Sequence, residues 1–437
     1  MLSIQGNRRS RDCEGTTRRD FLKLGALGLG AMSLPELLAA RSHAAQAGNP
    51  VKDTSIIWVW LSGGATHAET FDPKMSAPVE YRSVTGEVKT NLPGVTLGGN
   101  FEKLAGVADK MAFVRSFAHT NSGHGGGTHF VMTGYDNKNV DNGGLPTRPS
   151  LGSITAKLRG ANHPETGMPT YVRLNQIGSD GPAFLGTAFA PFGSSSEGRT
   201  NMTLRATSDR INDRRALLED FDRFQRDADR SGLMSGLDAF EQQAFNLILG
   251  KAPQAFDVKE ESSATRDMYG KDLGEQLLVA RRLVETGCGF VTVNYGGWDM
   301  HQNIERSMNQ RGPVLDRALA ALIGDLHDRG MQDNVLVVVS GEFGRTPRIN
   351  QDIGRDHWAA SWTVMMGGGG LKNGQAVGAT SNDGLQIADG SKAYLPGDIW
   401  ATVAMAMGIP VNTVHTSKRG RPMKLANGGT PIQELIG

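Results

Sequence analysis

Short, almost continuously apolar segments are the clearest pattern along the chain. Residues 56–61, 289–294 and 335–339 are rich in β-branched and aromatic side chains and show no regular alternation with polar positions. A strand covered on both faces has this pattern, whereas a half-exposed strand alternates. Weaker segments of the same kind lie at 111–114 and 362–366. The pattern therefore predicts buried strands of a parallel sheet.

Segments with helical spacing lie between these strands. In residues 313–329, Val, Leu and Ile recur every three or four positions, beginning with Pro313 at a first-turn position. Residues 271–286 carry a similar stripe. Strands that alternate with helices predict an α/β fold, with a mostly parallel sheet between helices and right-handed crossovers. Residues 207–265 are charged, helical in pattern and without strand signals, which predicts a helical insertion.

The start of the chain has the order of regions found in secretory signal peptides. Residues 1–23 are polar and basic, 24–34 are apolar and rich in Gly and Ala, and 42–47 are small residues suited to cleavage. The apolar run is too short for a membrane span, which needs about 20 residues. Residues 17–23 (TRRDFLK) resemble the twin-arginine consensus, which indicates export by the twin-arginine translocase.

We therefore expect a signal peptide over residues 1–47 and one α/β domain over 48–437, exported in the folded state to the periplasm or the extracellular space. No transmembrane segment is expected in the mature chain. Cys288 would be its single thiol, so no internal disulfide can form, and its apolar surroundings indicate a buried structural residue. The formal net charge of +1 argues against a nucleic-acid-binding protein.

Glycine turns with His and carboxylate side chains follow the predicted strands. In an open parallel sheet, ligands bind beyond the carboxyl ends of the strands. Neutral imidazole and carboxylate are the usual ligands of Zn²⁺ and related divalent ions. The main candidates are the pairs Asp299–His301 and Asp356–His357. The other histidines in these turns are His67, His119, His124 and His129.

Several long motifs resemble a known bacterial family. They are LSGGATHAETFDPK, HTNSGHGGGTHFVMTG, YGGWDMHQN, GEFGRTPRIN and GRDHWAASWTVMMGGGGLKNGQAVGAT. From about residue 55 to its end, the chain resembles the family of domain of unknown function 1501. That family in turn resembles the alkaline phosphatase and sulfatase superfamily. The resemblance implies a mostly parallel sheet between helices, with two metal sites at the strand ends.

The resemblance also implies roles for particular residues. Asp299 and His301 resemble the metal ligands that follow one strand of the superfamily, and His357 resembles the late His that completes the same site. Glu342 resembles the carboxylate of the second metal. The chain departs from the superfamily pattern at three positions: Phe343 stands where His or Asn is usual, Ser62 where a bridging Asp is usual, and His124 where the nucleophile lies. His67, Glu69 and Asp72 are the candidates to replace the missing acid.

These features together predict an exported, metal-dependent hydrolase of small or polymeric phosphate or sulfate esters. The cofactor would be a divalent ion (Zn²⁺, Ca²⁺, Mg²⁺ or Mn²⁺). Glu342 would assist a second ion or act as a base, and Arg345 with Arg348 could neutralise charge on the transferred group. His124 would be a ligand, a general acid–base or a nucleophile. The alternative is a non-catalytic metal-binding scaffold or binding protein of the same fold.

Overall fold

The computed structural model describes residues 53–193, 252–417 and 420–436. The predicted signal peptide and most of the predicted helical insertion lie outside these residues. The chain divides into two units, of which the larger spans 52–413 and 424–437. Residues 414–423 of the smaller unit contain the strand β13 (Val414–Thr416) and most of β14 (Pro422–Lys424), which pair with each other. Across the described ranges, no helix has the length and apolar character that a membrane span requires.

An eight-stranded sheet is the centre of the larger unit. All of its strands run in the same direction except β11, which is antiparallel to both of its neighbours, β4 and β8. The predicted mostly parallel sheet is therefore confirmed. In spatial order the strands are β12 (Gln375–Val377), β4 (Ala112–Phe117), β11 (Trp362–Gly368), β8 (Val335–Ser340), β1 (Ser55–Trp60), β7 (Phe290–Asn294), β5 (Tyr171–Leu174) and β6 (Phe192–Gly193).

The three strongest predicted strands are neighbours in the middle of this sheet. Trp58 of β1 lies opposite Thr292 of β7 on one side and Val338 of β8 on the other. Every residue of β1 and β8 is buried. Their continuous apolar pattern follows from this position, because both faces of the central strands are covered.

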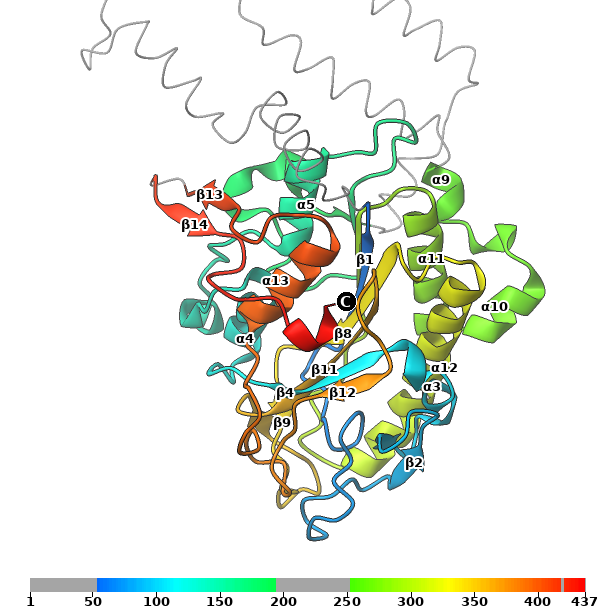
Figure 1. Ribbon diagram of the computed structural model, residues 1–437, viewed down its shortest axis with the longest axis vertical. Helices are drawn as coiled ribbons and strands as arrows, with labels where there is room; N and C mark the ends of the chain where they lie inside the picture. Colours follow the sequence, from blue (N-terminus) through cyan, green and yellow to red (C-terminus); the bar gives the residue numbers. More distant parts are fainter. Residues whose placement is uncertain (1–52, 194–251, 418–419, 437) are drawn as a thin grey trace, which may run out of the picture. The chain divides into compact units, whose positions relative to one another are not determined.

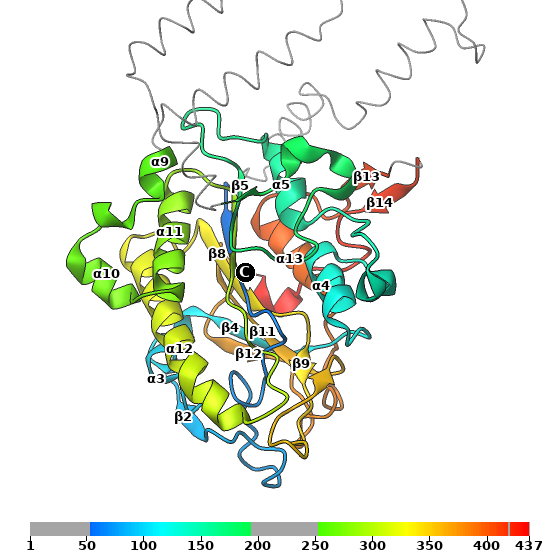
Figure 2. The same cartoon turned by 180° about the vertical axis from the view of Figure 1, so that it is seen from behind.

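Successive side chains of β1 point to opposite faces of the sheet, where they join two separate apolar cores. Ile57 and Val59 pack with one set of helices, and Ile56 and Trp58 pack with the other. The first set is α3 (Glu102–Ala105), α9 (Ala252–Ala255), α10 (Ser263–Tyr269), α11 (Leu273–Glu285) and α12 (Ile304–Asp328), seen on one side of the sheet in Figure 1. The second set is α4 (His124–Thr133), α5 (Leu151–Arg159) and α13 (Pro396–Ala406), seen again from behind in Figure 2.

Helix α12 is longer than its sequence pattern predicts. It begins at Ile304, and Pro313 lies inside it, where a first-turn position had been expected. The prediction was wrong because Ile304 and Met308 extend the buried stripe toward the N-terminus, across a stretch that is otherwise polar. The missing N–H of Pro313 costs the helix one hydrogen bond, but packing of its buried face maintains the helix.

Two small antiparallel pairs and several 3₁₀ turns complete the described part of the larger unit. The pairs are β2 (Glu87–Lys89) with β3 (Thr96–Gly98), and β9 (Gly344–Arg345) with β10 (His357–Trp358). The 3₁₀ turns are Ala108–Lys110, Lys138–Asn142, Ala183–Leu185, Thr187–Phe189, Val258–Glu260 and Gln433–Leu435.

Candidate metal centre

The predicted site loops emerge at one edge of the sheet. The turns after β1, β7, β8 and β4 all lie at the carboxyl ends of these strands, because the four strands run in the same direction. Strand β11 runs in the opposite direction, so its amino end lies at the same edge. His357 precedes β11 on β10, where it pairs with Arg345 of β9. The edge thus collects residues from four distant parts of the chain.

Three ligand atoms meet at this edge. Asp299 Oδ1 lies 2.9 Å from His301 Nε2 and 3.2 Å from His357 Nε2, and the two imidazole nitrogens are 3.1 Å apart. Ligands that bind a tetrahedral ion at 2.0–2.2 Å lie roughly 3.4 Å from one another. The three atoms therefore have a spacing that fits one shared divalent ion.

The outer nitrogens of both imidazoles are held by hydrogen bonds. His301 Nδ1 donates to Asp356 Oδ1 at 2.7 Å, and His357 Nδ1 donates to the carbonyl of Ser122 at 2.8 Å. This places the proton of each neutral ring on Nδ1 and leaves the lone pair of Nε2 directed at Asp299. A His whose other nitrogen is fixed in this way is the usual arrangement at a metal. The convergence of two lone pairs and a carboxylate oxygen is unfavourable without positive charge beside them. The Arg345 guanidinium, which donates to Asp299 Oδ1 and His301 Nε2, supplies part of that charge.

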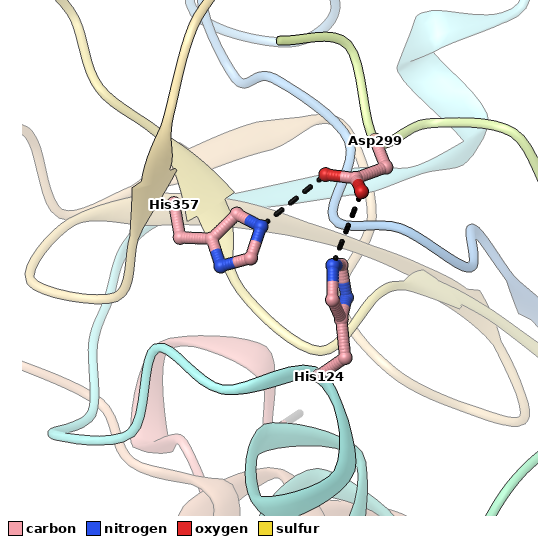
Figure 3. A group of neighbouring side chains, drawn as sticks. All are labelled: His124, Asp299 and His357. Carbon is pink, nitrogen blue, oxygen red and sulfur yellow. Dashed lines mark hydrogen bonds and ion pairs between the residues drawn. The ribbon is translucent and has the colours of Figure 1, made fainter. Parts of the chain in front are cut away.

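His124 approaches the other oxygen of the same carboxylate. Its Nε2 lies 3.3 Å from Asp299 Oδ2, and its Nδ1 donates to Glu342 Oε1 at 2.8 Å. Figure 3 shows His124 and His357 on two sides of Asp299. One ligand atom from each of these three residues lies within 4.8 Å of the others, which also fits a metal site. The Asp299 carboxylate thus faces three imidazoles.

Glu342 lies beneath His124 and is only 2% exposed. Its Oε1 also accepts the backbone N–H of Gly63 at 2.8 Å, and His119 Nε2 donates to its carbonyl at 2.7 Å. Its Oε2 has no hydrogen-bond partner among the described residues. A buried carboxylate oxygen without a donor is rare. A cation beside His124 would satisfy it, which agrees with the role that the family resemblance implies for Glu342.

The charges at the centre suit metal binding. Burial alone would raise the pKa of Asp299, but hydrogen bonding to Arg345 and its charge hold this pKa at about 2. Burial lowers the pKa of His357. The hydrogen bond to Glu342 raises the pKa of His124. At neutral pH, Asp299 is therefore ionised and His357 is neutral, and these are the forms that bind metal.

Arg345 is completely buried, and all of its donors are engaged. A guanidinium has five N–H donors, and five acceptors surround this one. Arg345 therefore holds Asp299 in place, and each of its donors has an acceptor within the protein. The acceptors are the carbonyls of Gly63, Gly64 and Arg355, Asp299 Oδ1 and His301 Nε2. Arg348 is exposed and makes no comparable set of contacts.

His129 and His67 do not join this cluster. His129 is buried on α4, where its Nδ1 donates to the Tyr135 carbonyl at 2.7 Å and its Nε2 accepts the N–H of Thr147. Both of its nitrogens are thus occupied, and it lies five positions after His124 on a helix, which turns it to another face. His67 is buried beside Gly344, and burial lowers its pKa to about 4. Its ring therefore stays neutral within the loop packing.

The other two acids considered after β1 are used for structural ion pairs. Glu69 is fully buried and binds the equally buried Arg355 through both carboxylate oxygens, at 2.7 and 2.9 Å. Asp72 accepts from Thr380 at 2.6 Å and lies 3.1 Å from Lys74. Neither replaces the missing bridging acid in this structure. Three supporting contacts were not predicted. Ser122 and Gly63 act through main-chain groups, which no sequence motif reveals. Asp356 had been considered only as a metal ligand.

The solved structures similar to this chain include a sulfatase, an alkaline phosphatase and a lipoteichoic acid synthase. The PsFucS1 sulfatase from Pseudoalteromonas sp. is 13% identical, with a TM-score of 0.41, over 91% of this chain and 77% of that one. The lipoteichoic acid synthase LtaP from Listeria monocytogenes is 12% identical, with a TM-score of 0.40, over 88% and 76%. A mutant of the alkaline phosphatase PafA is 11% identical, with a TM-score of 0.36, over 89% and 99%.

Among curated proteins, no sequence matches this chain. The family profile described as "Protein of unknown function (DUF1501)" matches residues 53–436, nearly the whole part of the chain after the predicted signal. The resemblance seen in the motifs is therefore confirmed, and the chain belongs to this DUF1501 family.

Proposed function

We propose that the protein is a metal-dependent hydrolase of phosphate or sulfate esters, with one divalent ion held by Asp299, His301 and His357. The observation that carries this proposal is the convergence of their three acceptor atoms within 3.2 Å of one another. Two imidazoles and one carboxylate favour Zn²⁺ over Ca²⁺ or Mg²⁺, which prefer oxygen ligands. The class of ester follows from the motif resemblance to the phosphatase and sulfatase superfamily.

A divalent ion held at this position would supply Lewis acidity toward an ester oxygen. Proton transfer and orientation of the reacting groups would depend on side chains of the protein. Glu342 holds the His124 ring through Nδ1, so that Nε2 faces the centre next to Asp299. His124 is therefore oriented to give or take a proton at Nε2 while an ester bond breaks. Its ring is 43% exposed, so a substrate can reach it.

A metal-binding scaffold without turnover is the second candidate. Its support is specific: Arg345 has no free donor for a tetrahedral anion, and His124 stands where a hydroxyl nucleophile is found in the superfamily. In that case the ion would stabilise the loops at the sheet edge and no ester would be cleaved.

The two candidates differ in their response to a chelator. We expect the purified full chain to contain metal and to release the aryl alcohol from aryl phosphates or aryl sulfates. A chelator should abolish this release, and added Zn²⁺ should restore it. His124→Gln should lower the rate by about 10²–10⁴-fold while the bound metal is retained. The scaffold would be supported if the untreated protein released no aryl alcohol from any ester and the chelator lowered only its thermal stability.

We also propose that the chain is exported by the twin-arginine translocase, on the basis of residues 17–23. Arg18→Lys combined with Arg19→Lys should leave the precursor in the cytoplasm, because the translocase recognises this pair directly. Cell fractionation and immunoblotting measure the distribution. Arg8→Lys combined with Arg9→Lys, a second pair in the same basic region, is the control and should be exported normally. Unchanged export of the first variant would assign the chain to another route.

A further inference from the structure

We propose that Asn350 is a positioning residue of the metal centre, which fixes the Asp356 carboxylate against His301. This inference rests on the proposed metal site and deepens it. Asn350 lies in the loop between β9 and β10, at the end of the GEFGRTPRIN stretch. Its side chain is connected to the centre on two sides.

The amide nitrogen of Asn350 bridges the main chain and the partner of His301. Asn350 Nδ2 donates to the carbonyl of His301 at 3.0 Å and to Asp356 Oδ1 at 3.1 Å. The same Asp356 oxygen accepts from His301 Nδ1 at 2.7 Å. One amide group therefore ties the backbone of His301 to the carboxylate that orients its ring.

The amide oxygen of Asn350 holds the loop that carries Asp356. Asn350 Oδ1 accepts the N–H groups of Asp352 at 3.0 Å and Gly354 at 2.9 Å, and the N–H of Asn350 donates to the carbonyl of Gly354 at 2.9 Å. Ile353 within this turn has φ +57°, which a β-branched residue rarely adopts. The hydrogen bonds to Asn350 hold the turn against this preference.

The turn is packed against the main chain of the site. A Cβ on Gly354 would overlap the carbonyl group of His301, so only glycine allows this approach. The carbonyl of Ile353 accepts the N–H of Ile304 at 2.9 Å, at the first residue of α12. The loop thus has a fixed position relative to His301, and Asn350 is the side chain at its centre.

Asp356 needs this support because its side chain is 54% exposed. An exposed carboxylate gains little from a single charged partner and retains several rotamers. The second hydrogen bond from Asn350 restricts Asp356 to the rotamer that accepts from His301 Nδ1. That rotamer keeps the proton of His301 on Nδ1 and its lone pair on the metal side. Residues that orient metal-binding histidines typically contribute 10–100-fold to metal affinity.

The substitution Asn350→Asp removes the donor group of this side chain and keeps its acceptor oxygen. It keeps one oxygen to accept from Asp352 and Gly354, and it replaces the Nδ2 donor with an oxygen that repels Asp356. A matched control exists at Asn91, whose Nδ2 donates to the carbonyl of Gly106 at 2.9 Å and to Asp109 Oδ1 at 2.6 Å. Asn91→Asp thus loses the same kinds of hydrogen bond next to a carboxylate, away from the metal centre.

Zn²⁺ affinity of the full chain is the first measurement, by competition with a chromophoric chelator. We expect Asn350→Asp to bind Zn²⁺ about 10–100-fold more weakly than the wild type. Asn91→Asp should bind as the wild type does, and the two metal-free variants should have similar unfolding midpoints in urea. An Asn350→Asp variant that binds as tightly as the wild type overturns the proposal.

A second measurement keeps this inference separate from the proposed function. If the wild type binds neither Zn²⁺ nor any of the other divalent ions named above, the proposed metal-dependent function is wrong. The role of Asn350 can then still be tested by imidazole ¹⁵N spectra of the metal-free proteins. At a pH where the rings are neutral, His301 should carry its proton on Nδ1 in the wild type and in Asn91→Asp. In Asn350→Asp the fraction of this tautomer should fall, because only the Arg345 donor to His301 Nε2 still favours it. An equal fraction of this tautomer in all three proteins would then exclude the positioning role.

Discussion

Arg345→Met is expected to lose about 1–3 kcal/mol of folding free energy, because it leaves buried carbonyl acceptors without their donor. Methionine has similar length but no donor. The carbonyls of Gly63 and Gly64 and the Asp299 carboxylate would each lose a hydrogen bond from a fully buried guanidinium. Urea denaturation followed by tryptophan fluorescence measures the loss. Metal binding should fall as well, because Asp299 would no longer be held.

Two further variants make this prediction specific. Arg345→Lys keeps the charge but offers three donors in place of five, so its stability should fall between those of the wild type and Arg345→Met. Arg348→Met removes an exposed arginine three positions away and should change stability by no more than about 0.5 kcal/mol. If Arg345→Met were as stable as Arg348→Met, Arg345 would not be a structural support of the centre.

Asp299→Ala is expected to lower the bound metal by about one equivalent. Asp299 supplies the one carboxylate oxygen that both His301 and His357 face, so no other described residue can replace it at that point. Metal analysis of the purified protein measures the stoichiometry. His357→Ala should have the same effect, since it removes a second of the three ligands.

Asp299→Asn tests whether loss of metal reflects unfolding. It keeps an oxygen that accepts from Arg345, so the protein should fold, yet it removes the negative charge that attracts the ion. Asp333→Ala is the control, because Asp333 is exposed and precedes β8 at the opposite edge of the sheet. Unchanged stoichiometry in both Asp299→Ala and His357→Ala would contradict the proposed centre.

The sequence predicted the sheet well because its central strands are covered on both faces. The apolar runs at 56–61, 289–294 and 335–339 correspond to β1, β7 and β8, which lie side by side. Since parallel strands end at one edge, the turns that carry Asp299, His301 and Glu342 were expected to meet there. His357 lies on β10, before the antiparallel β11, so its place in the cluster followed from the family resemblance. The error at Pro313 arose because packing outweighed the local preference of proline for a first turn.

Side-chain direction and burial could not be predicted in the same way. His124 and His129 belong to one motif, but five residues along a helix send one toward Asp299 and the other toward the Tyr135 carbonyl. Arg345 and Arg348 look equivalent in the sequence, yet one is fully buried and the other exposed. These differences depend on contacts with distant segments, for which a single sequence carries no pattern.

The reversed direction of β11 has a consequence for how the site is assembled. Strand β8 leaves the sheet at the carboxyl edge and β11 returns at that same edge, so residues 341–361 never depart from it. Within this one segment lie Glu342, Arg345, Asn350, Asp356 and His357. Their mutual arrangement needs only short loops to close, which costs little chain entropy. About half of the centre is therefore carried by a single continuous piece of the chain between two neighbouring strands.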